Sequence, residues 1–142
     1  MQTDMNYEKD FYKWAISQAE LLRSGKLVAA DIENIAEEIE SMGRSEKREL
    51  ISRLEVLLMH LLKWKFQPSL QSKSRLFTIK EQRIRIINHL EDNPSLKGKL
   101  TEIMPKAYKL ARIAAMRETG LEESIFPEMC PYSFEQAMFE EM

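Results

Sequence analysis

Arg83 is the residue whose place in the sequence most clearly demands a partner. If residues 76–90 are turned at about 100° per residue, the guanidinium falls inside an apolar arc roughly 100° wide. The arc consists of Leu76, Ile79, Ile86, Ile87 and Leu90. Because arginine does not ordinarily deprotonate, burying its charge without a partner is costly. We therefore expect Arg83 to reach a carboxylate or to face a cleft.

The acidic segment 31–43 offers carboxylates for this guanidinium. On a helical wheel, Glu33 and Glu40 lie just beside the apolar face of that segment. The first interpretation is a partly buried ion pair of Arg83 with Glu40 or Glu33, which would set the register of two helices. Arg83 could instead receive an anionic ligand, or its charged end could reach the rim while its stem stays buried.

His60 lies on the flank of a strongly apolar run, in HLLKWKFQ, one turn before Trp64. With Glu33, Glu37 or Glu40 it could form a carboxylate–histidine metal site of the kind that helical bundles support. The signal is weak, because no HxxxH occurs and Leu57 occupies the position of the glutamate in Glu-x-x-His. A structural His60 that hydrogen-bonds a carboxylate is the preferred interpretation. Together the candidate polar cluster is Glu33, Glu37, Glu40, His60 and Arg83.

A basic segment suggests a second kind of site. Net charge is −4 over residues 1–62, +6 over 63–99 and −4 over 100–142. The candidate nucleic-acid face consists of Lys63, Lys65, Lys73, Arg75, Lys80 and Arg85. Trp64, Phe66 and Phe77 are interleaved with these residues, and such a mixture can bind phosphates and stack bases. A sequence pI near 5.8 argues against this role, and the basic segment could equally match the acidic helices within the fold.

Cys130 is the single cysteine, so it cannot form an internal disulfide. It stands near Ser133, which with Gln136 forms a capping box for a short last helix, and a helix start can activate a thiol. Since no histidine lies nearby in the sequence to act as a base, nucleophilic catalysis is not favoured. We expect the tail to fold back instead, with Phe126, Tyr132 and Phe134 covering an opening of the core.

The elements that would position these residues are all helical. Apolar residues recur at helical spacing with N-caps and glycine stops between them, and alternating β-type runs are missing. The pattern predicts an all-α, single-domain bundle of about six helices without a sheet, covering residues 1–142. The expected helices are 7–24, 31–43, 45–66, a segment ending near 91, 94–120 and a short helix from 133. Gly43 leaves open that the second and third are one helix, and Pro105 should kink the fifth.

Composition narrows the classes of function. No run approaches the ~18 apolar residues of a membrane span, and the single cysteine fits a reducing compartment, so we expect a cytoplasmic protein without a membrane segment. No phosphate-binding glycine loop, HExxH, GxSxG or nucleotide fingerprint occurs. No motif therefore supports an enzyme, and we expect no cofactor and no metal.

Six stretches carry a resemblance to a known family. They are YEKDFYKWAISQAELLRSGK, NIAEEIESMGRSEKREL, LLMHLLKWKFQP, TIKEQRIRI, NPSL and FPEMCPYS, in that order. The chain resembles the small bacterial proteins, common in cyanobacteria, known as domain of unknown function 29. The resemblance implies an all-helical single domain and no particular activity. It also implies that a shared function would use Glu37, Glu40, His60, Lys63, Trp64, Arg83 and the turn 130–133.

The leading hypothesis is a non-enzymatic helical interaction module that binds an unknown protein partner or forms a homo-oligomer. This hypothesis rests on the predicted central helix 45–66, which is apolar around more than half of its circumference. Apolar surface in excess of what a core needs often marks a site for a partner. The alternatives are single-stranded nucleic-acid binding by residues 63–99, and a small anion- or metal-binding cleft around His60 and Arg83.

Overall fold

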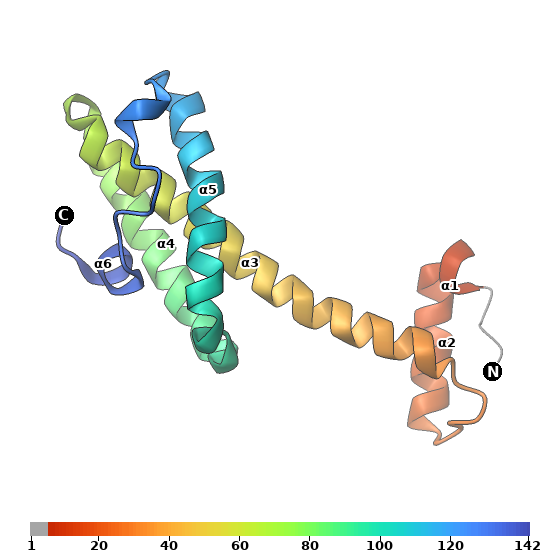
Figure 1. The fold of residues 1–142 in the computed structure, drawn as a ribbon. Coiled ribbons are helices and arrows are strands. Elements are labelled where there is room, and N and C mark those ends of the chain that lie inside the picture. Colours follow the sequence, from red (N-terminus) through yellow and green to blue (C-terminus); the bar gives the residue numbers. More distant parts are fainter. Residues whose placement is uncertain (1–5) are drawn as a thin grey trace. The chain divides into compact units, whose positions relative to one another are not determined.

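The computed structural model describes residues 6–142, and these residues contain six α-helices, three short 3₁₀ turns and no strand (Figure 1). The α-helices are α1 (Asn6–Lys9), α2 (Phe11–Arg23), α3 (Ile32–Phe66), α4 (Lys73–Asp92), α5 (Leu100–Thr119) and α6 (Phe134–Phe139). The all-helical class and the expected number of helices are thus confirmed for the described part of the chain. Residues 1–5 of the predicted domain lie outside it.

The chain divides into two compact units, which we call unit 1 (Met1–Ser45) and unit 2 (Glu46–Met142). The division falls within α3, whose first turns belong to unit 1 and whose remainder belongs to unit 2. The expectation of a single domain over 1–142 stays a prediction, and each unit is described by itself below.

Three helix boundaries differ from those expected. The predicted first helix is interrupted at Asp10, whose side chain accepts a hydrogen bond from the Lys13 amide and so caps a new helix. The predicted second and third helices are one, because Gly43 inside a helix costs only ~1 kcal/mol. Arg44 helps to hold that region helical, since its guanidinium lies 2.9 Å from Glu37 and 3.6 Å from Glu40. The fifth α-helix begins at Leu100 and not at Pro94, because residues 94–99 form a 3₁₀ turn.

Unit 1 has a small and partly polar core. Trp14 and Ala30 are its buried apolar residues, and Gln18 and Asp31 are buried with them. The indole of Trp14 donates to Asp31 Oδ2 at 3.1 Å, and the Asp31 amide donates to Gln18 Oε1 at 2.7 Å. These hydrogen bonds satisfy the polar groups, but they leave little apolar surface buried in unit 1.

Unit 2 contains the main hydrophobic core, to which α3, α4, α5, α6 and the segment before α6 all contribute. The buried α3 residues are Leu50, Leu54, Leu57, Leu58, Leu61 and Leu62. Their spacing along α3 places them on more than one side of the helix, so the broad apolar circumference predicted for residues 45–66 is covered within unit 2. The expected surplus of exposed apolar surface on this helix is therefore wrong.

The tail folds back onto unit 2 as predicted. Phe126 is buried, and Cys130, Tyr132 and Phe134 pack against the same core. In residues 6–142 no helix has an apolar stretch long enough to cross a membrane.

Candidate functional site

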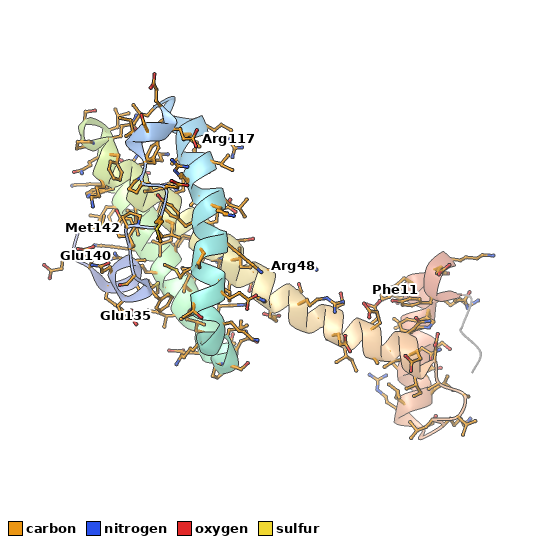
Figure 2. All side chains as sticks on the ribbon, in the orientation of Figure 1. Phe11, Arg48, Arg117, Glu135, Glu140 and Met142 are labelled. Carbon is orange, nitrogen blue, oxygen red and sulfur yellow. The ribbon has the colours of Figure 1, made fainter. Side chains whose placement is uncertain are left out.

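Arg83 lies on α4 and contacts the C-terminal segment. Its Nε donates to the Ala137 carbonyl oxygen at 2.9 Å, and its Nη2 lies 3.8 Å from Met142 Sδ. Burial lowers the pKa of Arg83, and the nearby Glu140 opposes that shift. Glu140 and Met142 both lie on the segment that follows α6 (Figure 2). We expected a pair with Glu40 or Glu33, and the structure corrects this, because the hydrogen bond goes to the end of α6.

The acidic residues of the predicted cluster belong to unit 1, whereas His60 and Arg83 belong to unit 2. Glu37 and Glu40 are exposed and contact Arg44, and Glu33 is exposed in the first turn of α3. The structure thus brings Glu37 and Glu40 together around Arg44, and it gives His60 and Arg83 neighbours from unit 2.

The ring of His60 has one nitrogen without a partner. Its Nδ1 is buried and makes no hydrogen bond within residues 6–142, so the expected bond to a carboxylate is wrong. Burial lowers the pKa of His60, Lys63 lowers it further, and Glu118 opposes both effects. This environment favours a neutral imidazole, which is consistent with a packed histidine and gives no support to the predicted cleft around His60 and Arg83.

Several cations of the candidate nucleic-acid face are held by neighbouring side chains. Lys63 is 8% exposed and lies 3.6 Å from Glu118, and Arg85 lies 2.8 Å from Glu81. Arg75 donates to Gln67 Oε1 at 3.4 Å. The remaining members of the face lie as follows: Lys65 over the rings of Phe66 and Tyr132, Lys80 over the ring of Phe77, and Lys73 exposed at the start of α4. The buried Lys63 is therefore no phosphate-binding group in this conformation.

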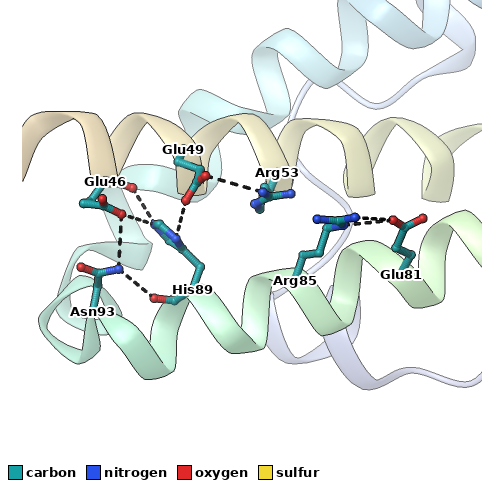
Figure 3. Close-up of polar contacts among 7 residues, drawn as sticks. All are labelled: Glu46, Glu49, Arg53, Glu81, Arg85, His89 and Asn93. Atoms are coloured by element: carbon teal, nitrogen blue, oxygen red, sulfur yellow. Dashed lines mark hydrogen bonds and ion pairs between the residues drawn. The ribbon is translucent and has the colours of Figure 1, made fainter.

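A polar cluster of Glu46, Glu49 and His89 joins α3 to α4. The sequence did not lead us to expect it. His89 is 7% exposed, and its Nδ1 lies 2.6 Å from Glu49 Oε2 (Figure 3). Its Nε2 lies 2.8 Å from the Glu46 carbonyl oxygen and 3.6 Å from Glu46 Oε2. His89 lies in the last turn of α4, and its side chain is buried there. His89 follows the buried Ile86 by three residues, so the two lie on the same face of α4. This spacing could have predicted that His89 is buried.

Cys130 does not have the environment of a reactive thiol. Burial raises the pKa of the thiol, and a backbone hydrogen bond with Tyr132 opposes that shift only in part. The Sγ donates to the Tyr132 carbonyl oxygen at 3.3 Å. Burial likewise raises the pKa of the Tyr132 phenol, to about 12. Both groups therefore stay protonated near neutral pH, which suits packing and not nucleophilic chemistry.

An apolar groove of about 400 Å³ lies on unit 1 between α2 and the first turns of α3. Its lining residues are Phe11, Trp14, Ala15, Gln18, Ala19, Leu22, Ile35, Glu38, Ile39 and Met42. Three of the apolar side chains are half exposed or more, with Phe11 at 50%, Ile39 at 62% and Met42 at 67%. The periodicity correctly predicted the apolar faces of both helices, but it could not show that they remain open to solvent.

One edge of this groove is fixed by a hydrogen bond and by contacts between tilted aromatic rings. Tyr7 OH donates to Glu38 Oε1, and this bond is the main reason that the pKa of Tyr7 rises to about 12. The Tyr7 ring lies 4.7 Å from the Trp14 ring, and the Phe11 ring lies 5.5 Å from that of Trp14, between ring centroids. Aromatic side chains held in this way offer a preformed apolar surface to a partner.

No curated protein and no solved structure matches the chain. The family described as "Domain of unknown function DUF29" matches residues 6–142. The match confirms the resemblance carried by the six stretches of sequence, and because it covers almost the whole chain, the protein belongs to the DUF29 family.

Proposed function

We propose that the chain is a non-enzymatic protein-interaction module that associates with a second copy of itself through the apolar groove of unit 1. The observation that carries this proposal is the exposure of Phe11, Ile39 and Met42 along one groove. Single exposed apolar residues are ordinary, but a groove lined by apolar side chains from two helices is typical of an interaction surface.

The small core of unit 1 gives a physical reason for association. Trp14 is the only large apolar residue of unit 1 that is buried, within residues 6–45. Units of about 40 residues usually need oligomerisation, a metal or a disulfide for stability. Each Å² of apolar surface removed from water contributes about 25 cal/mol to stability. A second copy that covers this groove would therefore add the apolar burial that the core of unit 1 lacks.

Charge around the groove favours a second copy as the occupant. The α2 helix carries Lys13 and Arg23 against one acidic residue, Glu20. The first turns of α3 carry more acid than base, namely Glu33, Glu37, Glu38 and Glu40 against Arg44. A twofold arrangement that sets α2 of one copy against α3 of the other would pair opposite charges at both rims of one self-complementary interface.

Sedimentation of the full chain at low and high concentration tests this proposal. We expect a concentration-dependent dimer, and we expect Ile39→Glu or Met42→Glu to convert it to a monomer. Both side chains are exposed, so these changes leave no cavity in a core. The matched control is Ile84→Glu, a residue of α4 in unit 2 that is 60% exposed. A wild-type monomer at all concentrations, or a dimer that survives both groove variants, contradicts the proposal.

The proposal places the module in the cytoplasm, where the free thiol of Cys130 would persist. The nucleic-acid alternative stays a prediction, and the internal pairs of Lys63 and Arg85 do not favour it. A titration with single-stranded oligonucleotide at two salt concentrations decides it, since phosphate binding must weaken as salt rises.

A further inference from the structure

We propose that Glu46, Glu49 and His89 form a binding site for one divalent transition-metal ion, such as Zn²⁺, which would link α3 to α4. All three residues belong to unit 2, so this site is separate from the groove of unit 1. One potential ligand atom from each residue lies within 4.8 Å of those of the other two. In a tetrahedral zinc site, bonds of about 2.0–2.2 Å place neighbouring ligand atoms about 3.3–3.6 Å apart, so small side-chain movements would bring the three atoms around one ion.

The contacts of His89 show which of its ring nitrogens would face a metal ion. The Nε2 atom lies 2.8 Å from the Glu46 carbonyl oxygen, and a carbonyl can only accept, so Nε2 carries a proton. The other nitrogen, Nδ1, lies 2.6 Å from Glu49 Oε2, and an ionised carboxylate can also only accept. Nδ1 is therefore the ring nitrogen that faces a side-chain carboxylate, and a metal ion would bind on this side of the ring.

The arrangement around the ring is the one that metal-binding histidines use. Such histidines donate the N–H of the second ring nitrogen to a carbonyl or carboxylate, which fixes the tautomer and the orientation of the ring. The Glu46 carbonyl fills this role for His89, which is itself almost fully buried. Asn93 Nδ2 lies 3.5 Å from Glu46 Oε2 and donates to the His89 carbonyl oxygen at 3.0 Å, so it restrains both ligands (Figure 3).

The nearby arginines leave these ligand atoms available. Arg53 lies 3.5 Å from Glu49 Oε1, whereas Oε2 of the same carboxylate faces the imidazole. Arg85 donates twice to Glu81, at 3.0 and 2.8 Å, so its charge is already neutralised. Helical spacing explains the convergence of the carboxylates, because residues three apart lie on one face of α3.

Space remains beside the cluster for further ligands of the ion. A surface cavity of about 210 Å³ is lined by Glu49, Arg53, Arg85, Asn88, His89 and Asp92. Three protein ligands and an open side are typical of a metal that keeps water or an outside ligand in its remaining position. One imidazole nitrogen with carboxylate oxygens favours Zn²⁺ and neighbouring transition metals over Mg²⁺ and Ca²⁺.

Titration of the tag-free, chelator-treated full chain with Zn²⁺ alone tests the site. We expect one equivalent to bind and to raise the melting temperature, whereas Mg²⁺ has no such effect. The chain has only two histidines, so imidazole NMR signals report the site directly: the His89 signals should shift and the His60 signals should not.

Variants separate this site from adventitious binding. Glu46→Gln and Glu49→Gln retain shape and should each weaken Zn²⁺ binding by about tenfold or more. Glu135→Gln is the control, since Glu135 is an exposed carboxylate in the first turn of α6 and does not belong to the cluster, and it should leave the affinity unchanged. Circular dichroism checks that each variant folds. Absence of Zn²⁺ binding, unshifted His89 signals, or an affinity that survives both glutamine variants overturns the proposal and leaves the cluster as a polar contact between α3 and α4.

Discussion

Arg83 on α4 donates its Nε–H to the carbonyl oxygen of Ala137, at 2.9 Å, in the last turn of α6. The last four carbonyls of a helix lack partners within the helix, and a guanidinium next to them also interacts favourably with the helix dipole. A helix as short as α6 is not stable alone, so this contact and the burial of Met138 hold it on unit 2. The charge within the apolar arc of α4 thus serves to attach the C-terminal helix.

Replacing Arg83 by Met should therefore destabilise the C-terminal segment. The variant leaves the Ala137 carbonyl without its charged donor, and hydrogen bonds to charged groups contribute about 1.5–3 kcal/mol. We expect a loss of about 1–2 kcal/mol in urea unfolding, with faster hydrogen exchange in α6 than elsewhere. Arg85→Met is the control, since that exposed pair with Glu81 is worth no more than about 1 kcal/mol. Equal effects of the two variants would contradict this role of Arg83.

The pair of Lys63 and Glu118 gives a second prediction. Lys63 is nearly buried, and its Nζ lies 3.6 Å from Glu118 Oε1. Glu118→Gln leaves the lysine charge without its partner, so we expect a loss of about 1 kcal/mol, reduced from the value for buried pairs because Glu118 is partly exposed. The double variant Lys63→Met with Glu118→Gln should recover stability in denaturant unfolding. If the double variant is less stable than Glu118→Gln alone, the unpaired ammonium of Lys63 is not the cause of the loss of stability in Glu118→Gln.

The sequence was sufficient to predict the helices and the apolar faces, because both depend on local periodicity. Leu50, Leu54, Leu57, Leu61 and Trp64 recur at helical spacing in the predicted helix 45–66; the four leucines are buried in unit 2, and Trp64 is partly buried against the same core. The partner of Arg83 could not be predicted, because Ala137 offers a backbone oxygen that no pattern of side chains marks. The open face of α2 and α3 was missed for a related reason. An apolar stripe shows that a face prefers to be covered, and only the packing shows that Ile39 and Met42 stay exposed among the described residues of unit 1.

His60 should make stability depend on pH. Its pKa is lowered in the folded chain, mainly by burial, so the unfolded chain binds a proton first as the pH falls. The contribution to the free energy of unfolding is therefore complete above about pH 6.5 and declines as the pH falls toward the lowered pKa. We expect the free energy of unfolding of the wild type minus that of His60→Gln, measured with urea, to decrease between pH 7.5 and pH 5. A difference that is constant or grows toward acid would contradict the prediction.

The two tryptophans allow the stability of each unit to be measured separately, because Trp14 lies in unit 1 and Trp64 packs against the core of unit 2. Unit 1 buries little apolar surface, so fluorescence of the Trp64→Phe variant, which reports Trp14, should show the lower urea midpoint. The Trp14→Phe variant, which reports Trp64, should show the higher one. If a second copy covers the groove, the Trp14 midpoint must also rise with protein concentration, since binding to the folded state stabilises it, while the Trp64 midpoint stays constant. Ile39→Glu should remove this dependence and Ile84→Glu should keep it. Coincident transitions at every concentration would mean that the units unfold together and that the groove gains nothing from a partner.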